Sequence, residues 1–447
     1  MIKKCLPILL VIALVFSSIA LAEEEPQING YLHSEQGQRI LHVWGTYYEM
    51  GFAHGYMLGD EIMDEFRGYI LELLPPTIWA AGHTVIPWFF GVPDEFHGEL
   101  EGILDGMRAA GVNTFVTQLG RNLDYKDLLF ANAVADLGAM ACSTEMAWKD
   151  GTIGDPNYSG ETIVGRNLDW ALAGPDKMLL PRSTIVIVYH PTLPGHKIVA
   201  SVTFPGFTSC LSCMNEEGVT MVLNIAHNGV GLFNVDFNEG FQHIGITARQ
   251  ALHQDVNHDN VYDINDIIDN VADFPRSGAA VLNLAEPVGD GTGDPAVIME
   301  VDNGGWVLRR PEDEEGFGNY LLAATNDLRK LRSHRKCDRF DLLQERAIAS
   351  GGRLTMNSLA VNLADVFQNR FLSTTVQTLY FIPHIQMMGV AYSDENKWST
   401  EKNPVFLDWE TVTELPEGVS LETDEDLVSE PLDQAQIDED TETGCGG

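Results

Sequence analysis

The sequence is poor in basic residues. It contains 27 Lys and Arg against 65 Asp and Glu, which gives a formal net charge of −38. A surface this acidic repels nucleic acid and anionic lipid and attracts cations. We therefore expect no nucleic-acid partner.

Long apolar runs are also scarce. One run, from about Leu6 to Ala20, lies between a pair of lysines and a small-x-small pattern that ends at Ala22. This layout is typical of a secretory signal peptide over residues 1–22. A membrane anchor is the alternative, but the run is short for a span of roughly 20 residues and acidic residues follow at once. We expect cleavage near Ala22, a secreted or periplasmic product and no stable membrane anchor.

Cysteine is the third scarce residue. Six occur, and removal of residues 1–22 leaves five, namely Cys142, Cys210, Cys213, Cys337 and Cys445. An odd set in an oxidising compartment leaves at least one thiol unpaired, which marks a candidate reactive residue. The C-x2-C pair has no second pair and no matching histidines, so a local disulfide or two structural thiols is favoured over a zinc site.

The pattern of apolar residues divides the chain at Cys142. Before it, three- and four-residue spacing predicts helices over 47–73, 95–110 and 115–135. After it, short β-rich runs separated by turn residues predict strands, and helical patterns recur at 244–253, 264–271 and 339–349. The predicted strands are 162–164, 184–190, 197–203, 220–225, 279–284, 296–301, 320–324, 375–382 and 388–392. A mixture without strict βαβ alternation indicates a layered α+β fold.

The last segment, residues 411–447, differs in composition from the rest. From Glu414 onwards it carries twelve acidic residues and no Lys or Arg. Such a segment cannot bury enough apolar surface to order itself, so it is interpreted as an acidic disordered tail.

Cys142 begins the first chemically suggestive pattern. A cysteine at a strand start is most simply structural, and no histidine lies close to it in sequence to act as a base. If the chain is cut before Cys142, however, the freed α-amino group can deprotonate the thiol, because their reference pKa values are about 8 and about 8.5. Arg166 would lower the thiol pKa further, and Asp169 could orient the ammonium group.

Two asparagines follow predicted strands. Asn224 and Asn326 are both simple turn candidates, yet an amide N–H is also a good uncharged donor to a developing oxyanion. A basic segment, residues 333–340, is most simply the solvated start of a helix. Together with Cys142, Arg166 and Asp169, the two asparagines favour an active site.

Six motifs occur in a fixed order over about 43–392. They are YEMG at 48–51 with HG at 54–55, ACST at 141–144, GRNLDW at 165–170, CMNEEG at 213–218 with LN at 223–224, ATND at 324–327 and SHRKCDRF at 333–340. The ordered set resembles the cysteine N-terminal-nucleophile amidases: the penicillin acyltransferase family, with acid ceramidase, N-acylethanolamine amidase and choloylglycine hydrolases as relatives.

The resemblance implies an αββα four-layer sandwich and self-cleavage before the nucleophile. Residues 23–141 would form a mostly helical pro-segment, and residues 142–410 the catalytic domain. Carried over by position, Cys142 is the nucleophile, Arg166 contacts the thiolate and Asp169 the α-amine, while Asn224 and Asn326 hold the oxyanion. Arg335 would be the structural or substrate-facing arginine, with Arg339 as the rival assignment.

A twelve-residue loop interrupts what resembles a family helix at residues 255–266. Side-chain oxygens fall at positions 1, 3, 5, 9 and 12, and position 7 offers a carbonyl, which is the spacing of a calcium loop. The ligands would be Asp255, Asn257, Asp259, Val261, Asp263 and Asp266. The loop resembles the dockerin type, although a solvated acidic turn is the simpler interpretation. We expect a structural Ca²⁺ and no organic cofactor.

The sequence thus predicts an exported amidohydrolase that cleaves a linear amide bond of a small N-acyl substrate. An acyltransferase of the same fold is the first alternative, because the acyl-enzyme is common to both and only the acceptor differs. A non-catalytic, calcium-dependent binding protein is the second.

Overall fold

The computed structural model describes residues 26–134, 140–230, 241–276, 278–289, 293–370, 373–419 and 421. The predicted signal peptide and nearly all of the predicted acidic tail lie outside these residues. Among the helices that the described ranges contain, none is long and apolar enough to cross a bilayer.

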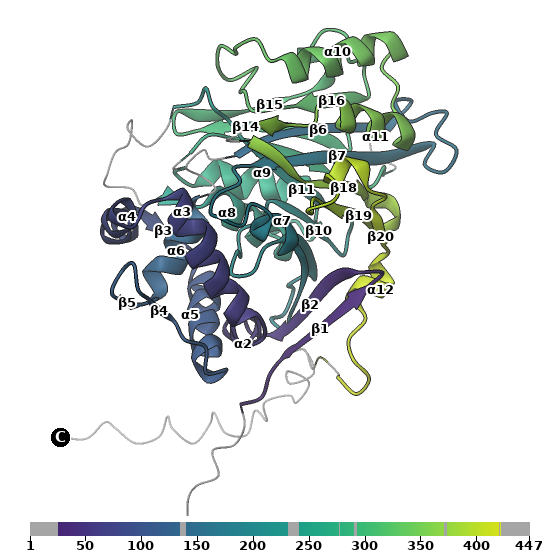
Figure 1. The fold of residues 1–447 in the computed structure, drawn as a ribbon. Helices are drawn as coiled ribbons and strands as arrows, with labels where there is room; N and C mark the ends of the chain where they lie inside the picture. The colour runs from purple at the N-terminus through teal and green to yellow at the C-terminus, as the bar shows by residue number, and fades with distance from the viewer. Residues whose placement is uncertain are drawn as a thin grey trace, which may run out of the picture.

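The larger sheet has nine strands and combines both sides of the predicted cleavage point (Figure 1). Its neighbours are antiparallel except for β2 and β8, which run parallel. The first two strands come from the segment before Cys142. In spatial order the strands are β1 (Gly30–Glu35), β2 (Gln38–Gly45), β8 (Ile185–Pro191), β9 (Val199–Thr203), β10 (Ser212–Asn215), β11 (Thr220–Ile225), β13 (Ala280–Ala285), β14 (Ala296–Asp302) and β15 (Gly305–Arg309).

The second sheet has seven strands, all paired antiparallel, and it contains Cys142. Its spatial order is β16 (Leu321–Ala324), β6 (Met140–Lys149), β7 (Gly160–Trp170), β18 (Ser373–Ile382), β19 (Met387–Tyr392) and β20 (Val405–Leu407), with β17 (Asn369–Arg370) also on β18. Two small pairs complete the strands: β3 (Phe90–Gly91) with β12 (Phe241–Gln242), and β4 (Phe115–Val116) with β5 (Arg121–Asn122).

Several of the long helices begin at capping boxes. Thr46 and Glu49 form a capping box at the start of α2, and Asp124 with Asp127 does the same for α6. The helices are α2 (Tyr47–Glu65), continued by a π-helical turn (Phe66–Ile70) and α3 (Leu71–Leu73), then α4 (Pro76–Phe89), α5 (Asp94–Ala109), α6 (Tyr125–Ala133), α7 (Leu179–Arg182), α8 (Ile244–His253), α9 (Ile264–Asp273), α10 (Asp338–Ser350), α11 (Met356–Asp365) and α12 (Trp409–Thr413).

The two sheets pack against each other through buried apolar side chains. Ile40 and Val186 of the nine-stranded sheet share one cluster with Val164 and Leu379 of the other sheet. Helices α10 and α11 pack on the seven-stranded sheet through a separate cluster that contains Phe340. This arrangement places strands β6 and β7 between the other sheet and the α10–α11 pair (Figure 1).

Helices α2 and α5 approach each other closely through glycine. A Cβ at Gly51 would lie 2.0 Å from the carbonyl oxygen of Glu99, and one at Gly55 would lie 1.9 Å from that of Ile103. The missing side chains therefore let the two helices pack backbone to backbone, and α5 holds α2 over β2 and β8.

The prediction of many strands with several helices is confirmed as a mixed α/β fold with several sheets. One local prediction is wrong. Residues 115–135 begin with the β4–β5 hairpin, and helix α6 starts only after Asp124, because Gly120 adopts φ 67° and Asp124 caps the helix. The strands β1 and β2 were not predicted, and they lie before the helices of the segment that precedes Cys142.

Candidate active site

The β6–β7 hairpin determines which way each candidate side chain faces. Cys142 is paired with Leu168, and Thr144 with Arg166, so these four side chains lie on one face. That face looks toward the nine-stranded sheet, where the Sγ of Cys142 lies 3.9 Å from the carbonyl oxygen of Leu223. Asp169 alternates to the opposite face, beside α10.

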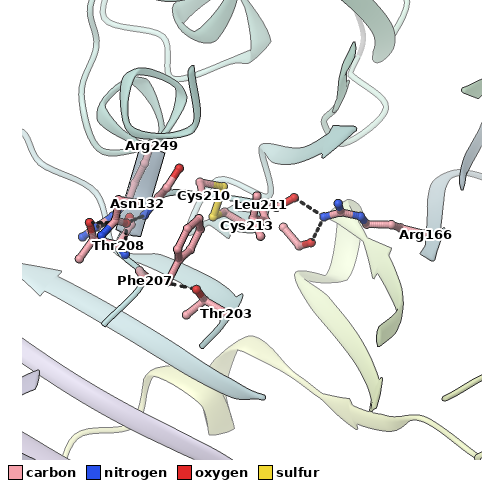
Figure 2. The surroundings of a disulfide bond; sticks show 11 residues. Asn132, Arg166, Thr203, Phe207, Thr208, Cys210, Leu211, Cys213 and Arg249 are labelled. Atoms are coloured by element: carbon pink, nitrogen blue, oxygen red, sulfur yellow. Dashed lines mark hydrogen bonds between the residues drawn. A yellow bond between two sulfur atoms is a disulfide. The ribbon is translucent and has the colours of Figure 1, made fainter. Parts of the chain in front are cut away.

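Arg166 is the nearest charged group to the thiol. Its Nη2 lies 3.1 Å from the Sγ of Cys142 and donates to the carbonyl of Leu223 at 2.6 Å. Its Nη1 donates to the carbonyl of Leu211 and to the hydroxyl of Ser212 (Figure 2). The side chain is fully buried, and among the described residues it has no ion pair with a carboxylate.

This arrangement makes the thiolate a natural counterion for Arg166. A buried guanidinium held only by neutral oxygens is costly, and an anion at 3.1 Å would offset that cost. In the uncut chain, burial raises the pKa of the Cys142 thiol, and Arg166 opposes that effect. The described part of the chain holds two free cysteines, Cys142 and the half-buried Cys337, and the C-x2-C pair is a disulfide.

Asp169 lies in a separate polar cluster behind the strand. Its Oδ1 accepts a hydrogen bond from Thr375 at 2.6 Å, and its Oδ2 lies 3.2 Å from Nη1 of Arg339. Burial raises the pKa of Asp169 to about 6, with Arg339 and then Thr375 opposing the shift. The carboxylate is therefore held close to Ala141, its partner in the strand pairing, but not against Arg166.

The two asparagines meet at the start of β6. The backbone N–H of Cys142 donates to Oδ1 of Asn326 at 2.9 Å, and Nδ2 of Asn326 donates to the carbonyl of Ile225 at 2.7 Å. Asn224 accepts from Thr144 at 3.1 Å and donates to the carbonyl of Thr325 at 3.3 Å. Both amides are buried. Asn326 contacts Cys142 itself, and Asn224 contacts Thr144, two residues further along the strand.

The two arginines of the basic motif lie in different surroundings. Arg335, the preferred assignment, is exposed and precedes helix α10. Arg339, the rival, is on the first turn of α10, and its guanidinium contacts the carbonyl of Cys142 at 2.5 Å and Oδ1 of Asn326 at 2.7 Å. The difference follows from position, because Arg335 precedes the helix, whereas Arg339 lies in its first turn, where Phe340 is buried against the sheet.

Sequence reasoning missed the neutral groups that hold these charges. Thr375, Ser143 and Ser212 contact Asp169, Arg339 and Arg166, respectively. Thr375 lies in a correctly predicted strand, but its pairing opposite Asp169 depends on the sheet order. Hydroxyls of this kind carry no distinctive sequence spacing, so only the three-dimensional arrangement identifies them.

In the predicted calcium loop, backbone N–H groups donate hydrogen bonds to carboxylates of the same loop. Asp255 accepts the backbone N–H groups of Asp259 at 3.2 Å and Asn260 at 2.8 Å, and Asn260 adopts φ 63° at the position usually held by glycine. Asp266 is buried and accepts the N–H of Val256 at 2.8 Å. Asn257, Val261 and Asp263 lie on the same loop between these residues.

A different group clusters three side chains of the kinds that bind metals. Within the described ranges, His83, Asp124 and Asp127 are the only three or more His, Cys, Asp or Glu residues whose ligand atoms all lie within 4.8 Å of one another. Asp127 is already bound by Arg121 at 2.5 Å and by Nε1 of Trp79 at 2.8 Å. Because a guanidinium occupies the carboxylate, this cluster is explained as a structural network that fixes α4 on α6.

Comparison with known sequences gives two partial matches. No known family profile matches the chain. The chain is 25% identical over 234 residues to an uncharacterized protein of Archaeoglobus fulgidus, which covers 47% of this chain and 36% of that protein. It is 24% identical over 307 residues to Protein dcd1B of Dictyostelium discoideum, which covers 63% of this chain and 53% of that protein. The chain thus spans only part of the length of these relatives.

Comparison with solved structures gives distant similarities to amidases. A Caenorhabditis elegans ortholog of N-acylethanolamine-hydrolyzing acid amidase aligns with 60% of this chain and 100% of its own, at 16% identity and a TM-score of 0.39. Penicillin V acylase from Agrobacterium tumefaciens aligns with 60% of this chain and 86% of its own, at 13% identity and a TM-score of 0.34. At these low values the chain is similar to these amidases only in outline, and its function has to be argued from its own residues.

Proposed function

We propose that this protein is a self-processing cysteine N-terminal-nucleophile hydrolase of αββα architecture that cleaves a linear amide bond of a small N-acyl substrate. The observation that carries the proposal is the contact between Cys142 and Arg166. A buried thiol 3.1 Å from a buried guanidinium without a carboxylate partner is suited to form a thiolate. A structural cysteine has no need of that neighbour.

Self-processing would use groups already in contact with the scissile residue. The Cys142 thiol attacks the carbonyl carbon of Ala141, the C–N bond breaks, and the thiol proton passes to the leaving nitrogen. The product is a thioester and a free α-amino group, and water then hydrolyses the thioester to the carboxylate of Ala141 and a free thiol. Asn326 and Arg339 hold the amide N–H and the carbonyl of Cys142, so the new amine stays in place.

Turnover would repeat the same chemistry on a substrate. The freed α-amine takes the thiol proton, the thiolate attacks the substrate carbonyl, and the leaving amine receives the proton. Asn224 and Asn326 are the neutral donors for the oxyanion, and each amide group keeps a second N–H beyond the contact already described. Asp169 would stabilise the α-ammonium form. Water as acceptor gives a hydrolase, and an amine as acceptor gives the alternative acyltransferase.

The first test is intact mass and denaturing-gel analysis of the purified protein beside Cys142→Ala. We expect two fragments that meet between Ala141 and Cys142 in the wild type and one chain in the variant. Cys337→Ser is the matched control, because it removes the other free thiol that the described residues contain and should cut normally. A wild type that stays whole at every pH and calcium concentration would refute the proposal and favour the exported binding protein.

We also propose that the loop at residues 255–266 binds a structural Ca²⁺. The carboxylates of Asp255 and Asp266 already organise its backbone N–H groups, and Asn260 supplies the left-handed turn that such loops need. Ca²⁺ would add charge neutralisation between the carboxylates. Calcium should therefore raise the Tm of the wild type, and the rise should vanish in Asp255→Asn. An equal Tm with Ca²⁺ and with chelator would contradict the assignment.

A further inference from the structure

Thr375 of β18 is the neutral partner of Asp169, and the two residues lie directly opposite each other in the pairing of β18 with β7. The side chain of Thr375 is fully buried. Its hydroxyl donates to Oδ1 of Asp169 at 2.6 Å and accepts the backbone N–H of Gln368 at 2.9 Å. An N–H group only donates and an ionised carboxylate only accepts, so the hydroxyl proton is directed at Asp169.

The other oxygen of Asp169 lies beside the bond that the proposed cut would break. Oδ2 is 3.2 Å from Nη1 of Arg339, and the same nitrogen contacts the carbonyl oxygen of Cys142 at 2.5 Å. Asp169 is also paired with Ala141, the residue on the other side of that bond. Oδ2 is therefore close to the backbone that would become the new N-terminus.

Asp169 has hydrogen-bonding capacity that the uncut chain leaves unused. A carboxylate can accept about four hydrogen bonds. Among the described residues, two groups donate to Asp169, namely the Thr375 hydroxyl and the Arg339 guanidinium. The carboxylate is fully buried, which makes incomplete pairing costly. An α-ammonium group on Cys142 would supply the missing donors and a positive charge.

A purely structural role explains Thr375 less well than it explains its neighbour Thr378. The hydroxyl of Thr378 bonds to neutral groups, Oδ1 of Asn167 at 2.9 Å and the hydroxyl of Ser399 at 2.8 Å. The partner of Thr375 can instead gain or lose a proton. Burial raises the pKa of Asp169 to about 6, and Arg339 and then the Thr375 hydroxyl oppose that rise.

The charged surroundings of Asp169 are few. Arg339 approaches from α10, and Arg166 acts from the opposite face of β7. The thiol of Cys142 is the other titratable group that interacts with this carboxylate. Without the Thr375 hydroxyl, more of Asp169 would be neutral near pH 7, and its second oxygen would no longer be held in place.

We propose that Thr375 is a positioning residue for turnover: its hydroxyl holds Oδ1 of Asp169, which keeps Oδ2 directed at the α-amine that the cut creates on Cys142. The inference rests on the proposed amidase function and divides its chemistry into two stages. Self-cleavage takes place before the α-amine exists and does not need this contact. Turnover uses the α-amine as a base in every cycle and does need it.

The test measures both stages in Thr375→Val, which keeps the branched shape of the side chain and removes the hydroxyl. Precursor refolded from the unfolded state reports self-cleavage on a denaturing gel. The cut protein reports turnover with p-nitroanilides of acetic, butyric, hexanoic, octanoic and decanoic acids. We expect self-cleavage at about the wild-type rate, and a kcat/KM that is about two- to tenfold lower at pH 7.

The pH profile of turnover shows whether Asp169 is the group affected. In the wild type, kcat/KM should fall as the pH drops through about 6, where Asp169 takes up a proton. In Thr375→Val the same fall should lie about one to two pH units higher, because a hydrogen bond to the charged form has been lost. A merely structural defect would lower the rate by the same factor at every pH.

Two further variants serve as controls. Thr375→Ser retains the hydroxyl and should keep the wild-type pH profile. Thr378→Val removes a buried hydroxyl from the same strand, but its partners are neutral, so the profile should not move even if the Tm falls.

The outcomes separate this inference from the function on which it rests. A Thr375→Val enzyme with the wild-type turnover and pH profile would overturn the inference alone. A variant in which self-cleavage and turnover slow by the same factor would do the same. A wild type that fails to cut itself, or that cuts itself and hydrolyses none of the anilides, would overturn the proposed function and this inference with it.

Discussion

Removal of the Arg166 guanidinium gives the most direct measure of how the thiol is activated. The variant Arg166→Met keeps the length and the apolar stem of the side chain but removes the charge. A hydrogen bond from a charged donor contributes about 1.5–3 kcal/mol, and Nη2 lies 3.1 Å from the sulfur. Loss of that contact should raise the thiol pKa by about one to two units, since one unit corresponds to about 1.4 kcal/mol.

The assay is self-cleavage, which requires no knowledge of the substrate. Precursor isolated in the unfolded state is refolded at a series of values between about pH 6 and pH 10, and the cut fraction is followed on a denaturing gel. The rate in the wild type should rise with pH as the thiolate forms. In Arg166→Met the same rise should occur about one to two pH units higher.

Arg335→Met provides the matched control. It removes an arginine that is exposed in the structure and was the first choice in the sequence motif, so its pH profile should overlay that of the wild type. Circular dichroism of each refolded variant checks the fold. An unchanged midpoint in Arg166→Met, or a shift of equal size in Arg335→Met, would refute the idea that Arg166 stabilises the thiolate.

Three further predictions follow from buried groups. Burial raises the pKa of Glu145 to about 7. The cost of ionising Glu145 in the folded state is therefore absent below the pKa of the unfolded chain and complete above about pH 7. Denaturant titrations should show that Glu145→Gln stabilises the protein by about 3 kcal/mol near pH 8 and by little near pH 4. The Cys210–Cys213 disulfide closes the loop that holds Arg166, so the double serine variant should lose about 2 kcal/mol of stability and cut more slowly at neutral pH. The two fragments should co-elute on native size exclusion after cleavage, because β2 pairs with β8 across the cut, and separate elution would contradict that packing.

The sequence predicted elements with strong local signals. The helices 244–253 and 264–271 correspond to α8 and α9, since each has an apolar stripe and α9 also has the Asp263 capping box. The predicted strands after Cys142 coincide with β7 to β9, β11, β13, β14, β16, β18 and β19, although several bounds differ. These runs are largely apolar because both sheets are covered on their faces, and turn residues mark their ends.

The remaining features depend on long-range pairing. The β4–β5 hairpin was taken for the start of a helix, because its residues lack a clean alternation and the helix start signal at Asp124 follows it. Helix α4 was not predicted as a separate helix, although Pro76 at its first position is a start signal. The polar segment 149–161 forms the turn at the far end of the β6–β7 hairpin, where Lys149 pairs with Gly160, roughly 23 Å along the strand from Cys142.

Strand periodicity explains why the two arginines of the site do not compete for one carboxylate. Arg166 and Asp169 are three residues apart in β7, and an odd separation in a strand places two side chains on opposite faces. Had the separation been two or four, Asp169 would lie beside Arg166 and neutralise it. Asp169 instead lies 3.2 Å from Arg339 on one face of the sheet, and Arg166 contacts the thiol on the other face. A single strand thereby keeps a cation for the nucleophile on one side and a carboxylate near its backbone amine on the other.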